Sequence, residues 1–395
     1  MEKSVGMHVS AQEAEEPKVE LREVFRGAIR TALELMLEEE IKELVGAKRY
    51  ERVGGRVDRR NGTYLRRLMT SLGHLELRVP RSREHGATGE VLGRYRRRTE
   101  EIDDMVAAAY VHGVSTRNMK EVTESLMGDE VSRSTVSRIT KRLDAAVEEL
   151  RHAPIEGPQY YLYLDATHLD VRWARIVGDA AVLVAYAIGP DGYRRLLAVS
   201  LGAVEDEASW IDLLTMLIER GLTGVKLVIA DDHKAIAKAV RMVLPEASRQ
   251  RCLVHFERNV MAKAPRHLRG RVAKEFASIF AAPTRKEAKK QLEVFKAGLG
   301  SHLPEVVKCL DEGFGAGTAF YDFPHEHWSR IRTTNGLERL NREIKRRTRA
   351  IGAFPDRASV LRLVTAVLLH VTSRWSSRRY LTMACSNPAA TQAAA

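Results

Sequence analysis

The chain has 395 residues, of which 44% are hydrophobic and 29% charged, and its formal net charge is +12. This length suffices for about two or three domains with cores of their own, and the composition is that of an ordinary soluble protein. Its three cysteines, an odd number, and the lack of an apolar run of transmembrane length exclude a disulfide framework and a membrane-spanning protein. The polar, acidic start does not resemble a signal peptide, so we expect a cytoplasmic protein.

Basic residues are concentrated in two blocks, at residues 48–98 and 330–379. Many basic proteins are merely soluble, with charges spread evenly over a hydrated surface. Concentration into blocks favours a polyanionic partner instead, because Lys and Arg side chains neutralise the phosphates of nucleic acid. We therefore expect the chain to bind nucleic acid.

The first predicted elements lie in residues 19–100, and we expect disordered tails at 1–18 and 386–395. Apolar residues recur at helical spacing through residues 21–45, and Gly46 ends the pattern, which predicts one helix. Alternating apolar residues over 72–79 predict a short strand or hairpin.

A Gly- and Arg-rich segment, residues 54–62, lies between this helix and the strand. Its glycines permit close approach to the backbone of a partner. A solvated loop is the alternative interpretation. We favour phosphate contact by Arg59 and Arg60, and thus a basic DNA-binding region over residues 19–100.

Residues 101–157 are expected to hold three helices, at 102–111, 116–126 and 133–150, with Ser115 and Ser132 capping the second and third. The start of the third helix exposes small hydroxyl groups and cations around apolar residues, as the recognition helix of a helix-turn-helix does. An ordinary helical bundle is the alternative. The candidate DNA contacts of this region are Arg117, Ser134, Arg138, Lys141 and Arg142.

From residue 158 the pattern changes to α/β. Strands are predicted at 160–166, 169–173, 181–188, 194–201, 225–230 and 251–254, and helices at 207–220 and 233–244. Residues 258–325 read as almost wholly helical, with breaks at Pro283, 298–300 and 313–317. This layout matches a ribonuclease H-like core in two parts, 158–257 and 326–385, separated by an all-helical insertion.

Two aspartates stand where an α/β fold collects reactive groups. Asp165 lies in an apolar strand, where a lone carboxylate is costly unless it is paired or binds a cation. Asp231 ends a short, continuously apolar strand. A strand-end cap or a turn residue is the alternative for each aspartate alone. If the two strands are neighbours, the two carboxylates can share one Mg²⁺ ion.

Glu338 lies near the start of a strongly basic helix. Asn335 is the expected N-cap, which would put Glu338 at the third helical position, in the favourable field of the N-terminus. Three carboxylates from separate segments beside a row of cations suggest metal-dependent phosphodiester chemistry, with two Mg²⁺ ions or Mn²⁺ in their place. The predicted catalytic and metal-binding residues are Asp165, Asp231 and Glu338. The predicted phosphate contacts on this helix are Arg342, Lys345 and Arg346.

Several short motifs resemble those of the mutator-type DDE transposases of bacterial insertion sequences. Around the carboxylates they are LDAT at 164–167, ADDH at 230–233, QRCLVH at 250–255, RN at 258–259 and TTNGLERLN at 333–341. Upstream they are RNG at 60–62, TSLG at 70–73, VPR at 79–81, GVSTR at 113–117 and STVSR at 134–138. The resemblance spans about residues 20–375. It implies that the three carboxylates named above bind the metal ions on a ribonuclease H-like fold.

The second of these motifs departs from the family pattern. Where the family usually has a glycine, this chain has Asp232, so that a second carboxylate stands beside Asp231. Position in the motif favours Asp231 as the ligand. Two further candidates near the site are Asn335 and His233, which can contact substrate or merely cap its helix.

Cys252 and His255 form a Cys-x-x-His pair, which is half of a zinc site, with His325 and His327 as the obvious distant partners. A structural zinc is the less favoured interpretation. We prefer Cys252 as a core residue and His255 as a hydrogen-bonding group near the carboxylates or a phosphate. Trp328 can stack on a flipped base, although a core tryptophan is the preferred interpretation.

Together these features predict a DNA transposase in the bacterial cytoplasm, associated with the nucleoid. It would bind the terminal inverted repeats of its element through residues 50–145, cleave one strand with Mg²⁺ and join the 3′-hydroxyl to target DNA. Holding two ends of double-stranded DNA implies at least a homodimer on DNA. A DNA-binding repressor of the same fold without catalysis and a structure-selective nuclease are the alternatives.

Overall fold

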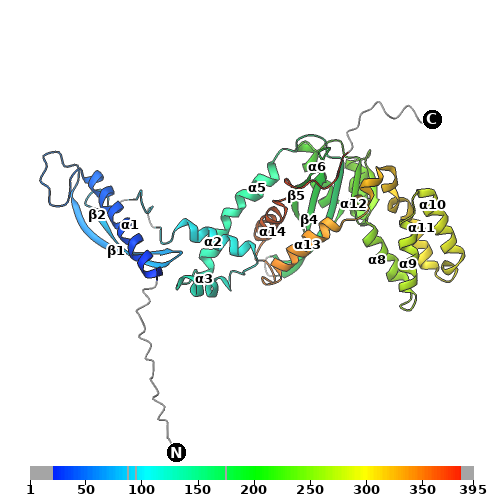
Figure 1. The fold of residues 1–395 in the computed structure, drawn as a ribbon, viewed down its shortest axis with the longest axis horizontal. Coiled ribbons are helices and arrows are strands. Elements are labelled where there is room, and N and C mark those ends of the chain that lie inside the picture. Colours follow the sequence, from blue (N-terminus) through cyan, green and yellow to red (C-terminus); the bar gives the residue numbers. More distant parts are fainter. Residues whose placement is uncertain (1–20, 87–88, 94–95, 174–175, 384–395) are drawn as a thin grey trace, which may run out of the picture. The chain divides into compact units, whose positions relative to one another are not determined.

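The computed structural model describes residues 21–86, 89–93, 96–173 and 176–383, so the predicted tails lie outside the described residues. The fold is mixed α/β, and the chain forms two compact units (Figure 1). Unit 1 comprises residues up to 108 together with 116–139, and unit 2 comprises residues 109–115 together with 140 onward. The finer division into regions at residues 100, 157, 257 and 325 stays a prediction.

Unit 1 is built on a hairpin covered by one long helix. Helix α1, Leu21–Val45, packs against strand β2, Gly73–Ser82, which pairs antiparallel with β1, Arg60–Thr70. The predicted helix and hairpin are confirmed, and β1 also takes in the end of the Gly- and Arg-rich segment. The buried core between them consists of Leu37, Leu68, Leu75, Leu77, Val79 and Leu92.

The helices that follow differ in part from the prediction. They are α2, Glu100–Val111; α3, Met119–Met127; α4, Arg133–Thr140; the 3₁₀ turn η1, Lys141–Leu143; and α5, Asp144–His152. Ser132 caps α4 as predicted, since its Oγ accepts a hydrogen bond from the backbone N–H of Thr135 at 3.3 Å. The predicted start at residue 116 is wrong, because α3 begins after Asn118. The prediction of a single helix over 133–150 is also wrong: the 3₁₀ turn η1 follows α4, and a new α-helix begins at Asp144.

A reason for this restart is visible in unit 2. The guanidinium of Arg362 donates to both carboxylate oxygens of Asp144, at 2.6 and 2.9 Å. Arg362 belongs to α14, Arg357–Thr372, and α5 packs along this helix. A long-range ion pair thus fixes the first residue of α5, which local spacing does not reveal.

Unit 2 contains a five-stranded mixed sheet in the order β5-β4-β3-β6-β7. Its strands are β3, Tyr161–Trp173; β4, Ile176–Ile188; β5, Arg194–Gly202; β6, Leu227–Ala230; and β7, Ser248–Arg251. The first three are antiparallel neighbours, whereas β6 runs parallel to β3 and β7 parallel to β6. The predicted strands at 160–166 and 169–173 are one strand, because pairing with β4 continues through Thr167 and His168.

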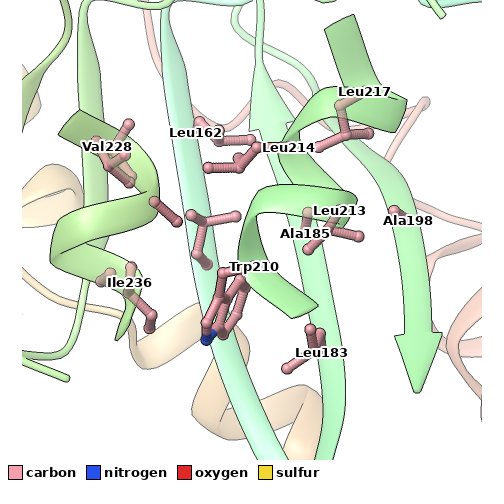
Figure 2. Packing of buried hydrophobic residues seen from close by; sticks show 14 of the residues in the cluster. Leu162, Leu183, Ala185, Ala198, Trp210, Leu213, Leu214, Leu217, Val228 and Ile236 are labelled. Atoms are coloured by element: carbon pink, nitrogen blue, oxygen red, sulfur yellow. The ribbon is translucent and has the colours of Figure 1, made fainter. Parts of the chain in front are cut away.

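One face of this sheet carries the main hydrophobic core. Helices α6, Glu207–Glu219, and α7, Lys234–Val243, cover it (Figure 2). The labelled residues of the core are Leu162, Leu183, Ala185, Ala198, Trp210, Leu213, Leu214, Leu217, Val228 and Ile236. Because side chains alternate along a strand, Leu162 and Leu164 of β3 face this core and Asp165 faces the opposite side.

The predicted helical insertion is confirmed as a helical segment. It contains α8, Leu253–Lys263; α9, Arg269–Phe280; α10, Arg285–Ala297; η2, Leu299–His302; and α11, Pro304–Gly317. The predicted strand at 251–254 is therefore wrong beyond Arg251. The break predicted at 313–317 comes later, since Gly313, Gly315 and Gly317 all lie inside α11, which ends at Gly317. A Cβ on Gly313 would lie 2.4 Å from Cζ of Phe256, so the glycine serves close packing against α8.

Three short turns, η3, Ala319–Asp322; η4, His325–His327; and α12, Trp328–Ile331, lead to α13, Asn335–Thr348. Helices α13 and α14 both pack against β3. None of the described helices combines the length and the apolar character that crossing a membrane requires.

Candidate active site

Asp165 and Asp231 are brought level by the pairing of β3 with β6. In this parallel pair, Tyr163 is the partner of Ile229. Each aspartate follows two residues later, so the same register continued beyond the last pair puts Asp165 beside Asp231. Asp231 comes directly after β6, whereas Asp165 lies within the longer β3. The condition for a shared ion, that the two strands are neighbours, is therefore met.

Asp231 also closes a turn, as the alternative interpretation proposed. Its Oδ1 accepts a hydrogen bond from the backbone N–H of His233 at 3.1 Å, just before α7 begins. This bond fixes the direction of the side chain at the carboxyl end of β6. The turn and a role in the site are therefore compatible.

The third carboxylate comes from the first turn of α13. The predicted N-cap, Asn335, is wrong: the cap position is Thr334, and Asn335 is the first helical residue. The backbone N–H and the hydroxyl of Thr334 both donate to Sγ of Cys252, at 3.3 and 3.1 Å, which anchors the helix start one residue earlier. Glu338 therefore occupies the fourth helical position, and its N–H donates to the carbonyl of Thr334 at 3.0 Å.

Close contact with the sheet also fixes the start of α13. Gly336 lies against the hydroxyl of Tyr186 on β4, and a Cβ at position 336 would lie 2.5 Å from that oxygen. The Tyr186 ring is fully buried and stacks on Tyr163, with 4.4 Å between the ring centroids. It cannot move aside without disturbing the sheet.

The three carboxylates line one pocket of about 430 Å³. All its lining residues belong to unit 2, and they come from β3, the loop before α6, the end of β6, α8 and α13. They are Asp165, Ala166, Thr167, His168, Glu205, Asp231, His255, Arg258, Glu338, Asn341, Arg342 and Lys345.

Asp165 is the most deeply buried carboxylate of the pocket, with 7% of its surface exposed. Removal from water is the largest influence on its pKa and raises it; His255 lowers the pKa, and Asp231 raises it further, with a result of about 7. Its Oδ2 accepts a hydrogen bond from Nδ2 of Asn341 at 2.8 Å. Negative charge on Asp165 is thus costly in the protein alone and favours a neighbouring cation.

Glu338 is contacted by two cations from α8. Its Oε1 lies 2.9 Å from Nη1 of Arg258 and 3.5 Å from Nε2 of His255. The pKa of His255 is raised to about 9, first through its contact with Cys252 and, against the effect of burial, by the nearby Asp165 and Asp231. His255 is therefore positively charged at neutral pH, in keeping with its predicted place near the carboxylates.

A fourth carboxylate, Glu205, was not predicted. It lies in the loop before α6, with its carboxylate 3.5 Å from Nδ1 of His233 and 3.9 Å from Nε2 of His168. Burial raises its pKa, which His233 partly offsets and Asp231 reinforces. A hydrogen bond from the Trp210 side chain also lowers its pKa. No periodicity marks this loop, and only its sequence position between β5 and α6 hints at the site.

The remaining candidates near the site have other contacts. Asp232 pairs with Arg249 and Arg251, each at 2.9 Å, and does not line the pocket, so Asp231 is the aspartate that faces it. Asn335 is exposed on α13 and lies outside the lining. Trp328 donates from Nε1 to the carbonyl of Phe323 at 2.7 Å and packs in an aromatic cluster.

The suggested zinc partners are engaged elsewhere. His327 contacts the hydroxyl of Tyr161 at 2.7 Å and the carbonyl of Thr382 at 3.0 Å, and His325 packs on Trp328. Cys252 is buried and holds Thr334, as described above. These contacts agree with the preferred interpretation of Cys252 as a core residue.

The predicted DNA contacts are distributed over the chain. Arg342 and Lys345 line the pocket, whereas Arg346 pairs with Glu343 at 3.0 Å. In unit 1, Arg60 pairs with Glu38 at 2.6 Å. The exposed residues among the other candidates are Arg117, Ser134, Arg138, Lys141 and Arg142.

Arg59 lies in a second hollow, within unit 1. This pocket has a volume of about 830 Å³ and four arginines in its lining: Arg52, Arg56, Arg59 and Arg83. Its cations suit a phosphate backbone, which is the interpretation favoured for the Gly- and Arg-rich segment.

The chemistry of the pocket suits a hard divalent cation. Carboxylate oxygens are the ligands that Mg²⁺ and Mn²⁺ prefer, and four carboxylates line the pocket. Among the residues that the structure describes, no three His, Cys, Asp or Glu side chains already form a group arranged to hold a metal ion. Glu338 is turned to Arg258 instead. The donor set fits such a cation, although its members are not gathered around one point.

The chain matches known proteins over most of its length. A sequence model of the family described as "Transposase, Mutator family" matches residues 1–378. The chain is 38% identical over 360 residues to the transposase for insertion sequence element ISRM5 of Rhizobium meliloti (strain 1021), covering 91% of this chain and 90% of that protein. It is 36% identical over 362 residues to the transposase for IS1081 of Mycobacterium tuberculosis (strain ATCC 25618 / H37Rv), covering 91% and 87%.

Two further matches are more distant. The transposase for IS256 in transposon Tn4001 of Staphylococcus aureus is 33% identical over 365 residues, which cover 91% of this chain and 93% of that protein. A chain of the Drosophila P element transposase strand transfer complex aligns with 71% of this chain and 82% of its own length, at 12% identity and a TM-score of 0.31.

Proposed function

The chain belongs to the Mutator family of transposases, and from this premise we propose that it carries out DNA transposition with a site of the DDE type. The family resemblance predicted from the sequence motifs is confirmed. In the proposed reaction the protein binds the terminal inverted repeats of its element, cleaves a DNA strand with the help of a divalent metal ion, and joins the freed end to target DNA.

The arrangement of the sheet supports a ribonuclease H-like core. Its order is β5-β4-β3-β6-β7, with an antiparallel meander of three strands followed by two parallel ones. The helices α8 to α11 come between the strand that precedes Asp231 and the helix that carries Glu338. This order supports the proposal of a two-part core with a helical insertion.

The observation that carries the proposal is the convergence of Asp165, Asp231 and Glu338 on one pocket. These residues would hold two divalent cations, Mg²⁺ or Mn²⁺. Bound cations of this kind promote deprotonation of the attacking water or 3′-hydroxyl and stabilise charge on the leaving oxygen. The protein contributes the direction of each carboxylate: Asn341 orients Asp165, and the turn at His233 orients Asp231.

The cations of the pocket suit the DNA backbone. Arg342 and Lys345 come from one face of α13 and line the pocket beside the carboxylates, so that they can contact phosphates next to the bond that is cut. Arg258 neutralises Glu338 in the protein alone. We propose that Arg258 turns to a phosphate when Glu338 binds a cation.

Residues 50–145 would bind the terminal inverted repeats. The hollow lined by arginines in unit 1 supports phosphate contact there. The capped start of α4, with exposed Ser134 and Arg138, supports a helix-turn-helix that reads the major groove. The protein would act as at least a homodimer on DNA, because two ends must be joined.

The decisive experiment compares Asp165→Asn with the wild-type chain on duplex DNA that carries the element ends. The variant keeps its size and loses one negative charge, so end binding should persist while Mg²⁺-dependent nicking disappears. Asp170→Asn is the matched control, since Asp170 is exposed on the same strand and does not line the pocket. Normal nicking by the Asp165 variant would reject the proposed site, and loss of end binding would show a structural defect instead.

A further inference from the structure

A third concentration of positive charge lies in the helical insertion and begins at the pocket. Residues 258–274 contain six Lys and Arg residues and no Asp or Glu. All six are exposed, and they extend from the second half of α8, through the turn that follows, to the first half of α9. We call them the insertion row: Arg258, Lys263, Arg266, Arg269, Arg271 and Lys274.

Most charges of the insertion row have no counter-charge in the protein. Arg258 lies 2.9 Å from Glu338, and Arg269 donates from Nε to the carbonyl of Ala264 at 3.2 Å. The side chains of the other four form no hydrogen bond or ion pair with any residue that the structure describes. Short or compact exposed residues lie between the cations, so that another backbone can approach closely: Ala262, Pro265 and Gly270. Such a surface suits the phosphates of DNA.

The insertion row leaves the pocket on a different side from α13. Arg258 lines the pocket, and its contact with Glu338 joins α8 to the start of α13. The two helices diverge from there (Figure 1). Since α13 carries Arg342 and Lys345 along its own side, two sets of cations lead away from the carboxylates in different directions. DNA that crosses the pocket would therefore meet a separate positive surface on each side of the bond that is cut.

The α13 side fits the end of the element. The last turn of α13 packs on Gly113, where a Cβ would lie 3.3 Å from Cα of Arg347, and both residues belong to unit 2. Gly113 connects α2 to α3, within the residues 50–145 that we propose bind the inverted repeats. An end held by those residues would reach the carboxylates along α13. The α8 side is then left for a second DNA.

We propose that the insertion row binds the phosphate backbone of the target DNA. This inference rests on the proposed function and adds to it the place of the second DNA. Phosphate contacts carry no sequence information, so a row of Lys and Arg suits a partner that is met in many sequences. The DNA that flanks the element is joined to the end until cleavage and needs no affinity of its own, whereas the target is captured from solution.

The test uses duplexes that carry a pre-cut element end with a free 3′-hydroxyl, a plasmid as target, and Mg²⁺. No flank is present, so that the plasmid is the only DNA that can occupy the insertion row as a target. The rate of joining is measured against plasmid concentration. Arg266→Gln/Arg271→Gln should raise the KM for the plasmid about tenfold and change kcat by less than about twofold, because the pocket is intact.

Two matched variants show whether position and charge matter. Lys286→Gln/Lys289→Gln removes the same charge from exposed positions of α10 and should keep the wild-type KM. Arg266→Lys/Arg271→Lys keeps the charge and should restore most of the affinity, because Lys binds phosphate as a point charge. The slope of log KM against log salt concentration should be smaller in the Gln variant on α9 and the preceding turn, by roughly two.

Nicking of uncut ends separates this inference from the proposed function. It needs the metal ions and the element end but no target, so every variant of this series should nick at the wild-type rate. Absence of Mg²⁺-dependent nicking in the wild type would contradict the proposed function itself. Normal nicking together with a wild-type KM in Arg266→Gln/Arg271→Gln would overturn the insertion row alone.

Two further results would also overturn the inference. The first is an equal rise of KM in the α10 variant, which would show an effect of net charge and not of place. The second is slower nicking of uncut ends with normal joining of pre-cut ends, which would show that the insertion row holds the flank and not the target.

Discussion

Asn341 donates a hydrogen bond from Nδ2 to Oδ2 of Asp165 at 2.8 Å, and so joins α13 to the central strand of the sheet. Asn341 follows Glu338 by three residues, which is slightly less than one helical turn. The bond therefore ties the helix that carries Glu338 to the strand that carries Asp165. No other side-chain hydrogen bond joins these two elements in the described part of the chain.

Replacement of Asn341 tests this link. A hydrogen bond to a charged group contributes about 1.5–3 kcal/mol, so Asn341→Ala should lower the rate of strand cleavage roughly 10- to 100-fold. Single-turnover cleavage at saturating DNA measures the loss. Asn335→Ala on the same helix is the control and should cleave at the wild-type rate. Equal rates for the two variants would show that the bond does not position the site.

Asp231 and Asp232 should have separable roles. Asp231→Asn should abolish Mg²⁺-dependent cleavage and leave the fold intact, because Asp231 faces the pocket. Asp232→Asn should still cleave, but it leaves the buried Arg251 without its carboxylate partner and should lower the free energy of unfolding by about 1–3 kcal/mol. Urea unfolding and a nicking assay on both variants measure the two effects. Cleavage by Asp231→Asn with loss in Asp232→Asn would reverse the assignment.

The stability of the metal-free protein should depend on pH through Asp165. Its pKa is raised to about 7 in the folded protein, above the ordinary carboxyl value, so the folded state binds the proton more tightly than the unfolded state. Stability from this group is present at low pH and is lost as the pH rises from about 4 to about 7. With EDTA present, Asp165→Asn should raise the Tm more at pH 7.5 than at pH 5. An equal effect at both pH values would contradict the raised pKa.

Added Mg²⁺ should stabilise the wild type at pH 7.5, because a ligand that binds only the folded state raises the Tm. The shift should be absent in Asp165→Asn. Glu205→Gln should weaken the apparent Mg²⁺ affinity by about three- to tenfold, since it removes a nearby negative charge. Glu207→Gln is the control, because Glu207 pairs with Lys238 outside the pocket. A Tm shift of wild-type size in Asp165→Asn would argue against metal binding at this pocket.

The sequence predicts best where local pattern and tertiary structure agree. Helix α1 ends where predicted because its apolar spacing stops at Gly46. Asp165 and Asp231 lie side by side because each follows an apolar segment of a buried strand, and these two strands pair in parallel. The predictions fail where a distant residue decides the local structure, as Arg362 does at Asp144 and Phe256 does at Gly313.

The same reasoning explains what the sequence missed in the site. Glu205 lies in a loop without periodicity, and only the fold brings it to the pocket. The start of α13 was misplaced by one residue because the sulfur of Cys252, 82 positions away, holds Thr334. Neither the position of Glu205 nor the contact between Cys252 and Thr334 can be predicted from the spacing of nearby residues.

The contact between Gly336 and Tyr186 has a consequence for sequence tolerance. Even one added methyl group would collide with a ring that is locked in the sheet, and relief would have to come from displacement of α13. In a saturation library selected for active copies, position 336 should therefore be almost invariant, whereas its exposed neighbour Asn335 should accept many substitutions. The close contact between α13 and the Tyr186 ring thus limits which substitutions at position 336 are compatible with transposition.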